Sequence, residues 1–572
     1  MSTSSNGRCV TINQWEDAGT SLVAELGNYM DLSLNLAPNS LGEHAKPSEI
    51  ATRIDPTLKS IYKQMTQMSS TLARTRNRLV SPILQFPDEI ISAIFVNYVF
   101  GPMISKPPLS PSMTREVWQI QYRLDRLIRV CSSWRDILMA NGSFRSIIPV
   151  ITSSFSKRSP LEYSLQRAGG CQLYLAATDG GWQLSKPLLK VLTEYGSRFR
   201  AINLNTGDRD AIKGAMHKVL EQSTTGLLTE LSIRWINEYV TSPALPNDPD
   251  YILPRNHPKH ASFTDILGSL TAFRISGMQF HWDAMVFSTR LVELRIDSVT
   301  LGYDDAIISF LRALSLASEL RDLKIISVST FCRPGAAPDM GALSAIRFPN
   351  LQSLLLQDLY LNTLQILLPA FTPARHCLTL FLTGLCLKVN MLQSDELGGG
   401  QAQQSEQDRA ADLCTILQPY SLDTLTLGEH SEREVWLRGA ASHTLLKGLP
   451  TLKTLKLHNW IFELSEWEDL TRPRAARENP QEYPFAALEN LYMASAKIRC
   501  QYLDVVEEMV TSHPLRRVVL GGVYQTLTSS QTYNRSLEES TVVESLQHLV
   551  PEFQLVDKDC FPEFDWARWR LW

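Results

Sequence analysis

The sequence predicts an α/β protein in two parts. An all-helical N-terminal module is followed by a solenoid, in which a curved parallel sheet carries helices and loops on its convex side. Two patterns predict this arrangement. As far as about residue 150, apolar residues recur at steps of three and four, the period of an amphipathic helix. From about residue 160, short units of alternating apolar residues take over, the period of a strand with one buried face.

Length and composition restrict the class of protein. A chain of 572 residues is longer than one hydrophobic core usually organises. The net charge of -4, without a run of Lys and Arg, argues against a nucleic-acid partner. The 9 cysteines are scattered and never spaced as CxxC, so neither a disulfide framework nor a zinc site is indicated. No signal-peptide or membrane-spanning pattern is present, and we expect a cytoplasmic and/or nuclear protein with no membrane partner.

The N-terminal region divides into two segments. Residues 1–50 are polar and mixed, and are predicted to be poorly ordered. Residues 54–80 are predicted to form an amphipathic helix with Pro56 in its first turn. Its apolar seam has heptad spacing, with Thr75 in one place of the pattern, and consists of Ile54, Leu58, Ile61, Met65, Met68, Leu72 and Leu79. The seam either packs on the domain that follows or allows self-association through the 54–79 helix. So few heptads are marginal for a dimer, which favours the first alternative.

Residues 81–150 are predicted to form a small helical domain. One helix begins at Pro87, where Asp88 and Glu89 place negative charge at the positive end of the helix dipole. A proline-rich break at residues 101–112 ends it. Apolar positions at residues 117–138 then predict one long amphipathic helix that ends at Asn141-Gly142.

Residues 160–525 contain units that read Leu-x-x-Leu-x-Leu or a close variant. The units begin at Phe199, Leu228, Leu270, Leu291, Leu320, Leu351, Leu422, Leu452, Leu488 and Leu515, with a degenerate member at Leu378 and a candidate first member at Cys171. One such strand cannot bury its apolar face alone, but many strands stacked in parallel can. The units therefore predict a solenoid of irregular leucine-rich repeats. Three insertions are expected, at residues 241–260, 333–350 and 394–409.

Residues 526–572 are predicted to be a C-terminal cap or tail. Its tryptophans, Trp566, Trp569 and Trp572, either cover the open end of the solenoid or anchor a partner, and the cap is favoured. The exposed strand positions Glu230, Arg295, Lys324 and Asp423 mix both charges, so the sequence does not predict the charge of a ligand.

Two motifs in the helical domain resemble an F-box. SPILQFPDEI at residues 81–90 is similar to the family's Leu-Pro-x-Glu-Ile/Leu opening, and VCSSWRDI at residues 130–137 is similar to its Val-Cys-x-x-Trp helix. The order of heptad helix, F-box and irregular repeats resembles the large F-box-like families of mushroom-forming fungi over nearly the whole chain. Phe86 stands where the family has Leu, and the break at residues 97–116 is longer than in a minimal F-box.

The resemblance implies a function without catalysis. The chain would be the substrate-recognition subunit of an SCF-type cullin-RING ubiquitin ligase, which marks proteins for degradation. Its F-box would dock a Skp-family adaptor, and through it the cullin-RING scaffold, while the repeats bind an unknown protein substrate. The matched adaptor-binding residues are Ile83, Leu84, Phe86, Pro87, Ile90, Ile94, Leu127, Val130, Cys131, Trp134 and Ile137.

Two alternatives remain open at this point. Helices with these patterns must also pack on each other, so part of the matched set is expected to lie in the core or to support the contact. The chain could also be a repeat scaffold whose F-box-like helices do not join a ligase. An enzyme is disfavoured, because the sequence has no phosphate-binding loop, nucleophile elbow or zinc-protease motif. We therefore expect no catalytic residue, cofactor or metal.

Overall fold

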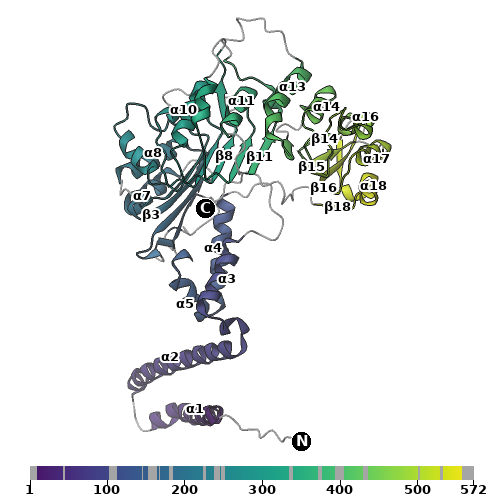
Figure 1. The fold of residues 1–572 in the computed structure, drawn as a ribbon. Helices are drawn as coiled ribbons and strands as arrows, with labels where there is room; N and C mark the ends of the chain where they lie inside the picture. The colour runs from purple at the N-terminus through teal and green to yellow at the C-terminus, as the bar shows by residue number, and fades with distance from the viewer. Residues whose placement is uncertain are drawn as a thin grey trace. The chain divides into compact units, whose positions relative to one another are not determined.

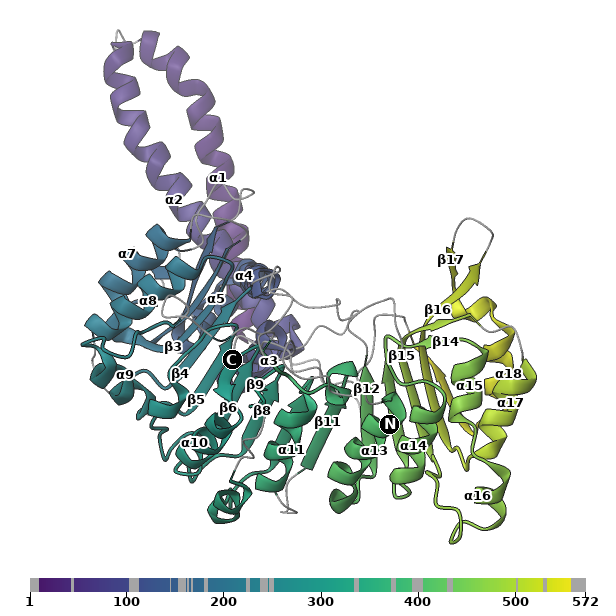
Figure 2. The same cartoon turned by 90° about the horizontal axis from the view of Figure 1, so that it is seen from above.

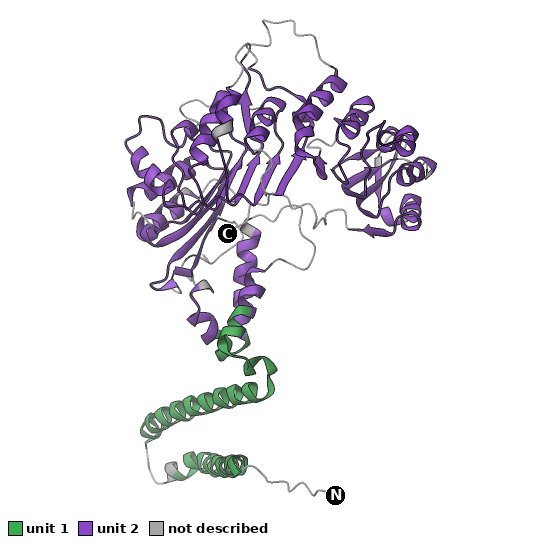
Figure 3. Cartoon of the chain, in the orientation of Figure 1, with its two compact units in different colours: residues 1–93, 130–135 green, residues 94–129, 136–572 purple. Residues whose placement is uncertain are grey.

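The computed structural model has an α/β fold, with an N-terminal helical region and a large, mostly parallel sheet (Figure 1). It divides into two compact units: residues 1–93 with 130–135, and residues 94–129 with 136–572 (Figure 3). The structure describes residues 10–42, 46–101, 113–144, 146–152, 161, 164–165, 168–179, 184–222, 227–236, 245, 251–333, 339–371, 377–392, 405–428, 436–499, 503–527 and 532–556.

The first unit consists of helices. They are α1 (Val10–Gly42), α2 (Pro47–Val80), the 3-10 helix η1 (Pro82–Gln85) and the first turns of α3 (Asp88–Phe100). Residues 10–42 differ from the expectation of a poorly ordered segment. Their apolar residues recur at helical spacing, and no proline interrupts them before Pro38. Helix α2 begins seven residues before Ile54, so Pro56 lies inside the helix and not in its first turn.

The remaining helices of the N-terminal region are α4 (Met113–Val130), α5 (Ser132–Ala140) and the 3-10 helix η2 (Gly142–Phe144). The sequence predicts one long helix here, but the chain breaks at Cys131, so the apolar pattern is shared by two helices. Within the second unit, Phe95, Leu124 and Leu138 are buried, and the ring of Phe100 stacks on Phe144 with 6.0 Å between centroids.

The large sheet has 16 strands, all parallel to their neighbours except β17, which runs antiparallel to β16. Along the sheet lie β1 (Ile147–Thr152), β2 (Leu173–Asp179), β3 (Phe199–Thr206), β4 (Glu230–Trp235), β5 (Ala272–Ser276), β6 (Glu293–Asp297), β8 (Asp322–Ile326), β10 (Ser353–Gln357), β11 (Cys377–Leu382), β12 (Thr424–Gly428), β13 (Thr454–His458), β15 (Asn490–Ile498), β16 (Arg517–Leu527) and β17 (Thr532–Arg535). Two further strands pair outside this order, β14 (Ile461–Phe462) with β15 and β18 (Glu552–Leu555) with β16. A separate pair consists of β7 (Thr300–Tyr303) and β9 (Ser329–Phe331).

Every unit that the sequence singled out lies on a strand of this sheet, including the degenerate member on β11 and the Cys171 unit on β2. The apolar residues of the units are buried, as Leu231 and Ile233 show on β4 and Leu323 and Ile325 on β8. They belong to one continuous hydrophobic core that follows the sheet from end to end. The alternating pattern thus marks the strand face that the returning segments cover.

Helices occupy most of the segments that return from one strand to the next, and they lie along one side of the sheet (Figure 2). They are α7 (Ser185–Tyr195), α8 (Arg209–Glu221), α9 (His260–Leu267), α10 (Asp305–Leu314), α11 (Leu361–Ala370), α13 (Glu406–Leu417), α14 (Ala440–Gly448), α15 (Leu464–Leu470), α16 (Arg474–Glu478), α17 (Leu503–Ser512) and α18 (Thr541–Leu549). Short 3-10 turns are η3 (Gly196–Arg198), η5 (Trp282–Ala284), η6 (Met340–Ala345), η7 (Gly384–Leu387), η8 (Gln418–Tyr420) and η9 (Leu537–Glu539).

A left-handed corner follows many of the strands. The residue directly after the strand has a positive φ, at Gly277 (73°), Ser298 (53°), Ser327 (47°), Asp358 (56°) and Asn459 (53°). The backbone N–H of each corner donates to a carbonyl of the neighbouring strand; for Ser298 the acceptor is Ile326, at 2.9 Å. The corner turns the chain out of the sheet while its amide stays bonded to the next strand.

The ends of the sheet extend beyond the expected span of 160–525. The sheet begins with β1, and residues 532–555, expected within a cap or tail, add β17, α18 and β18. The tryptophans at 566, 569 and 572 lie outside the described residues, as do residues 102–112 of the proline-rich break. Much of the three expected insertions, including residues 246–250, 334–338 and 393–404, lies outside them as well.

Candidate functional site

The first F-box-like motif forms the joint between α2 and α3. Ser81 N donates to Asn77 O (2.9 Å) at the end of α2, and η1 follows at once. Pro87 O then accepts from Ile90 N at 3.0 Å, which closes the first turn of α3. Asp88 and Glu89 lie in this turn, where negative charge favours the helix dipole. Two hydrogen-bonded turns therefore hold the backbone on both sides of Phe86-Pro87.

Helix α3 is apolar on two faces. Positions four residues apart on one face are fully buried: Ile91, Phe95 and Val99. The residues directly before them repeat the same spacing on the other face and are exposed: Ile90, Ile94 and Tyr98. A helix that is apolar all round is normally buried all round. The second face of α3 is therefore apolar surface that is exposed among the described residues.

The second motif lies between α4 and α5. Val130, the last residue of α4, is 56% exposed. Cys131 separates the helices, and its carbonyl accepts from Arg135 N at 3.1 Å in the first turn of α5. Trp134 in the same turn is half-buried. The segment 130–135 belongs to the same compact unit as residues 1–93, so the first motif and most of the second lie in one unit (Figure 3).

The predicted adaptor-binding residues differ in their exposure to solvent. Those that remain exposed in the first unit are Phe86 (53%), Pro87, Ile90 (49%) and Val130, and we call these four residues the apolar surface. Those that are half-buried in the same unit are Ile83, Leu84, Cys131 and Trp134. Ile94 is exposed one turn further along α3. Leu127 (7%) and Ile137 (9%) are buried in the second unit, which leaves them a supporting role in the core and no direct contact.

Two residues near this region were not among those predicted from the sequence. Tyr98 continues the exposed face of α3, and its step of four from Ile94 is a signal that the sequence analysis could have used. Arg123 on α4 donates from Nη1 to the carbonyls of Tyr98 (2.9 Å), Val99 (3.0 Å) and Gly101 (3.0 Å). Its guanidinium carbon also lies 5.6 Å from the centroid of the Tyr98 ring. A cation on the last carbonyls of a helix stabilises its C-terminus.

Charged side chains on neighbouring strands of the sheet form a ladder of ion pairs. Arg274 on β5 lies between Glu230 on β4, at 3.3 Å, and Glu293 on β6. On the following strands, Arg295 pairs with Asp297 (3.0 Å) and Lys324 with Asp322 (2.7 Å). Arg295, predicted to be exposed, is buried.

The ion pair between Arg274 and Glu293 keeps both side chains charged. Burial by itself lowers the pKa of Arg274, but hydrogen bonds and charge from Glu293 and Glu230 outweigh it and raise the pKa overall. Burial raises the pKa of Glu293, but the bond to Arg274 outweighs it and lowers the pKa. The ladder thus neutralises itself and leaves little net charge to attract a ligand.

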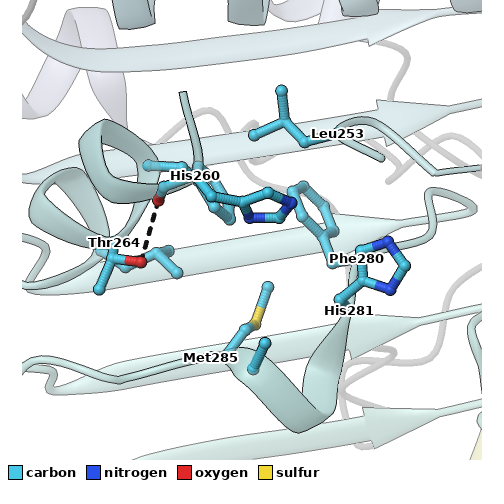
Figure 4. Close-up of a pocket in the computed structure, with 9 residues that line it drawn as sticks. Leu253, His260, Thr264, Phe280, His281 and Met285 are labelled. Atoms are coloured by element: carbon cyan, nitrogen blue, oxygen red, sulfur yellow. Dashed lines mark hydrogen bonds between the residues drawn. The ribbon is translucent and has the colours of Figure 1, made fainter. Parts of the chain in front are cut away.

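A small cavity beside α9 does not have the size of a substrate site. It holds about 20 Å³, room for a single water molecule. Figure 4 shows His260 and His281 among its lining residues, with Thr264 Oγ1 donating to His260 O at 3.0 Å. The ring of His281 stacks on Tyr251 at 3.9 Å between centroids, and His260 Nε2 lies 2.6 Å from Pro254 O. These contacts are those of packed side chains.

The part of the chain that the structure describes contains no metal cluster, and it buries two of its cysteines. Within it, no three His, Cys, Asp or Glu side chains converge as ligands of a metal ion would. Burial raises the pKa of Cys386, and raises that of Cys414 to about 11, which disfavours the nucleophilic thiolate. No helix among the described residues has both the length and the apolar character needed to cross a bilayer.

Comparisons with known proteins do not assign a family. No family model matches the sequence, and no curated protein matches it. Among solved structures, the chain is similar to a chain in the crystal structure of a TLR13–ssRNA13 complex, with 13% identity and a TM-score of 0.26. The similarity covers 66% of this chain and 44% of that chain. A TM-score this low supports neither a family nor a function.

Proposed function

We propose that this chain is a non-catalytic substrate-recognition subunit of an SCF-type cullin-RING ubiquitin ligase. Its F-box-like helices would dock a Skp-family adaptor, and its sheet would be a solenoid of irregular leucine-rich repeats that holds a protein substrate. The observation that carries the proposal is the apolar surface. Phe86, Pro87, Ile90 and Val130 remain open to solvent at positions where the two motifs match the family's adaptor contact.

We expect a few side chains of the apolar surface to contribute most of the binding free energy. Covering a Phe or Ile side chain that is half exposed stabilises a complex by about 1–2 kcal/mol each, at about 25 cal/mol per Å2. Phe86 and Ile90 lie on either side of the hydrogen-bonded joint between η1 and α3, so little backbone freedom is lost when they bind. Trp134, in the first turn of α5, is half-buried, so it has less area left to cover.

The sheet offers the second interface of the proposal. Because the charge ladder of Arg274, Arg295 and Lys324 is paired with carboxylates, a protein substrate would be selected by shape and hydrogen-bonding pattern more than by net charge. The chain then needs no catalytic group. Holding the substrate beside the carrier of ubiquitin raises its effective concentration, and positioning alone accelerates the transfer.

Co-expression with a Skp-family adaptor tests the proposal. We expect the two proteins to co-purify, and Phe86→Asp or Ile90→Asp to weaken the complex at least about 100-fold, because a charge replaces an anchor. Pro87→Ala and Trp134→Ala should weaken it less. Tyr62→Asp is the matched control, since Tyr62 is an exposed apolar residue of the same unit outside the apolar surface.

Two outcomes contradict the proposal. If a folded chain forms no complex with the adaptor, the helices do not join a ligase and the chain is a repeat scaffold. If a complex forms but neither Phe86→Asp nor Ile90→Asp changes its affinity, the contact lies elsewhere. Circular dichroism and the thermal midpoint of each variant show whether the chain is folded.

A further inference from the structure

Helices α1 and α2 both carry apolar seams that the fold does not bury. The α2 seam follows the heptad pattern from Ile54 to Leu79. The α1 seam has the same period, with Gly19 and Ser33 in two places of the pattern, and consists of Ile12, Trp15, Leu22, Leu26, Tyr29 and Leu36. None of the described side chains of either helix is buried. Long helices of this kind gain most of their stability from covering such a seam.

The two helices hardly touch each other, so neither covers the other's seam. Residues 43–46 alone separate them, and they run in opposite directions (Figure 2). On α1, Leu22 in the seam is 41% exposed, whereas its neighbour Val23 outside the seam is 70% exposed. On α2, Met68 in the seam is 37% exposed, whereas Tyr62 outside it is 75% exposed. The central seam residues are thus less exposed than residues outside the seam, but they too remain in water.

The net charges of the two helices are equal in size and opposite in sign. Helix α1 has no Lys or Arg, and its acidic residues Glu16, Asp17, Glu25 and Asp31 give it a net charge of -4. Helix α2 has six basic residues, Arg53, Lys59, Lys63, Arg74, Arg76 and Arg78, and two acidic ones, which leaves a net charge of +4. The α1–α2 hairpin is therefore acidic along one side and basic along the other.

We infer that two copies of the chain pair their α1–α2 hairpins into an antiparallel four-helix bundle. In this bundle each α1 lies between its own α2 and the α2 of the second copy, so acidic and basic helices alternate around the core. The four seams then face one another and exclude water. Because the α1–α2 hairpin carries equal numbers of both charges, with the net negative charge on one helix and the net positive charge on the other, the acidic helix of one copy can pair with the basic helix of the other. A two-fold symmetric interface requires such a surface that is complementary to itself. This property favours a second copy over an unrelated helix.

The mass of the full-length chain in solution tests the inference. Light scattering during size-exclusion chromatography should give twice the monomer mass of 64.5 kDa at about 10 μM and above. Leu22→Asp and Leu72→Asp place a charge in the seams and should raise the dimer dissociation constant at least about 100-fold. Val23→Asp is the matched control, because it introduces the same charge one residue away, outside the seam, and should leave the dimer intact.

Charge reversal distinguishes this bundle from other dimers. Glu16→Lys with Glu25→Lys should weaken the dimer about 10-fold or more, because α1 then faces basic helices on both sides. Adding Lys63→Glu and Arg74→Glu to the same chain should restore the affinity. A chain that is monomeric at all concentrations overturns the inference. A dimer that tolerates Leu22→Asp and Leu72→Asp, or one that the second pair of reversals does not restore, overturns it equally.

Discussion

His513 connects three segments of the second unit. Its ring lies directly after α17 and is buried. Nδ1 accepts from Leu488 N at 3.2 Å before β15, and Nε2 donates to Leu470 O at 2.8 Å at the end of α15. Burial lowers the pKa of His513 to about 4; the hydrogen bond to Leu470 opposes this change, and the charges of Arg472 and Arg477 add to it. The ring must therefore be neutral for both hydrogen bonds to persist.

Because of His513, we expect the folded protein to lose stability in acid. An unfolded histidine takes up its proton near pH 6.5, whereas His513 in the folded chain does so only near pH 4. Between these values the unfolded state binds one more proton, so the free energy of unfolding falls as the pH is lowered, by about 3 kcal/mol in all. Urea unfolding at pH 7, 6, 5 and 4 measures this loss.

His513→Asn should reduce the slope of stability against pH between 6.5 and 4, because asparagine offers an acceptor and a donor without titrating. His548→Asn, at an exposed histidine on α18, is the control for the substitution and should keep the slope of the parent chain. Equal slopes for the parent and for His513→Asn would show that another group causes the acid loss.

At the scale of elements, the strands and the corners differ in how well the sequence marks them. Each strand follows from its alternating leucines, but the left-handed corner after it is occupied by Gly277, Ser298, Ser327, Asp358 and Asn459 without a common residue. A left-handed backbone costs a residue with a side chain about 1 kcal/mol. Hydrogen bonds to the next strand offset this cost, and those bonds exist only once the strands are stacked.

Gly277 is the corner where a side chain has no space. Its φ is 73°, and a Cβ atom there would lie 2.8 Å from Trp235 O. Gly277→Ala should therefore lower the free energy of unfolding by about 1–3 kcal/mol, through the left-handed backbone and the clash together. Gly170→Ala is the control, since a Cβ at Gly170 meets no atom within 4 Å. Thermal unfolding measures both, and equal midpoints for the two variants would contradict the clash.

Helix α3 has one face that packs in the protein and one that remains in water. Its buried face, with Ile91, Phe95 and Val99, packs in the protein, and the face one residue earlier remains in water. A soluble helix that needed only to fold would place polar residues there. We therefore expect polar replacements of Ile90 and Ile94 to leave the stability of the fold nearly unchanged, because both side chains are exposed.

At the scale of the whole molecule, the proposed adaptor contact and the proposed pairing of α1–α2 hairpins together predict one assembly. The seams of α1 and α2 and the apolar surface use different residues, so two chains and two adaptors should form a complex with 2:2 stoichiometry. Leu22→Asp should reduce this complex to one chain with one adaptor. Phe86→Asp should leave a dimer of chains without adaptor. Native mass spectrometry distinguishes these species, and loss of adaptor in Leu22→Asp would show that the two contacts depend on each other.

The sequence by itself determined the local elements of this protein, because helical and strand periodicity are properties of neighbouring residues. It located α2, the beginning of α3 and the strands of the large sheet from β2 to β16 except β14, and it marked the residues that resemble an F-box. It did not identify α1, the break at Cys131 or the strand β18. Only the tertiary structure decided which apolar residues remain in water. Leu127 and Val130 look alike in the pattern, but one is buried and the other is exposed, because burial depends on which segments distant in sequence pack against each side chain.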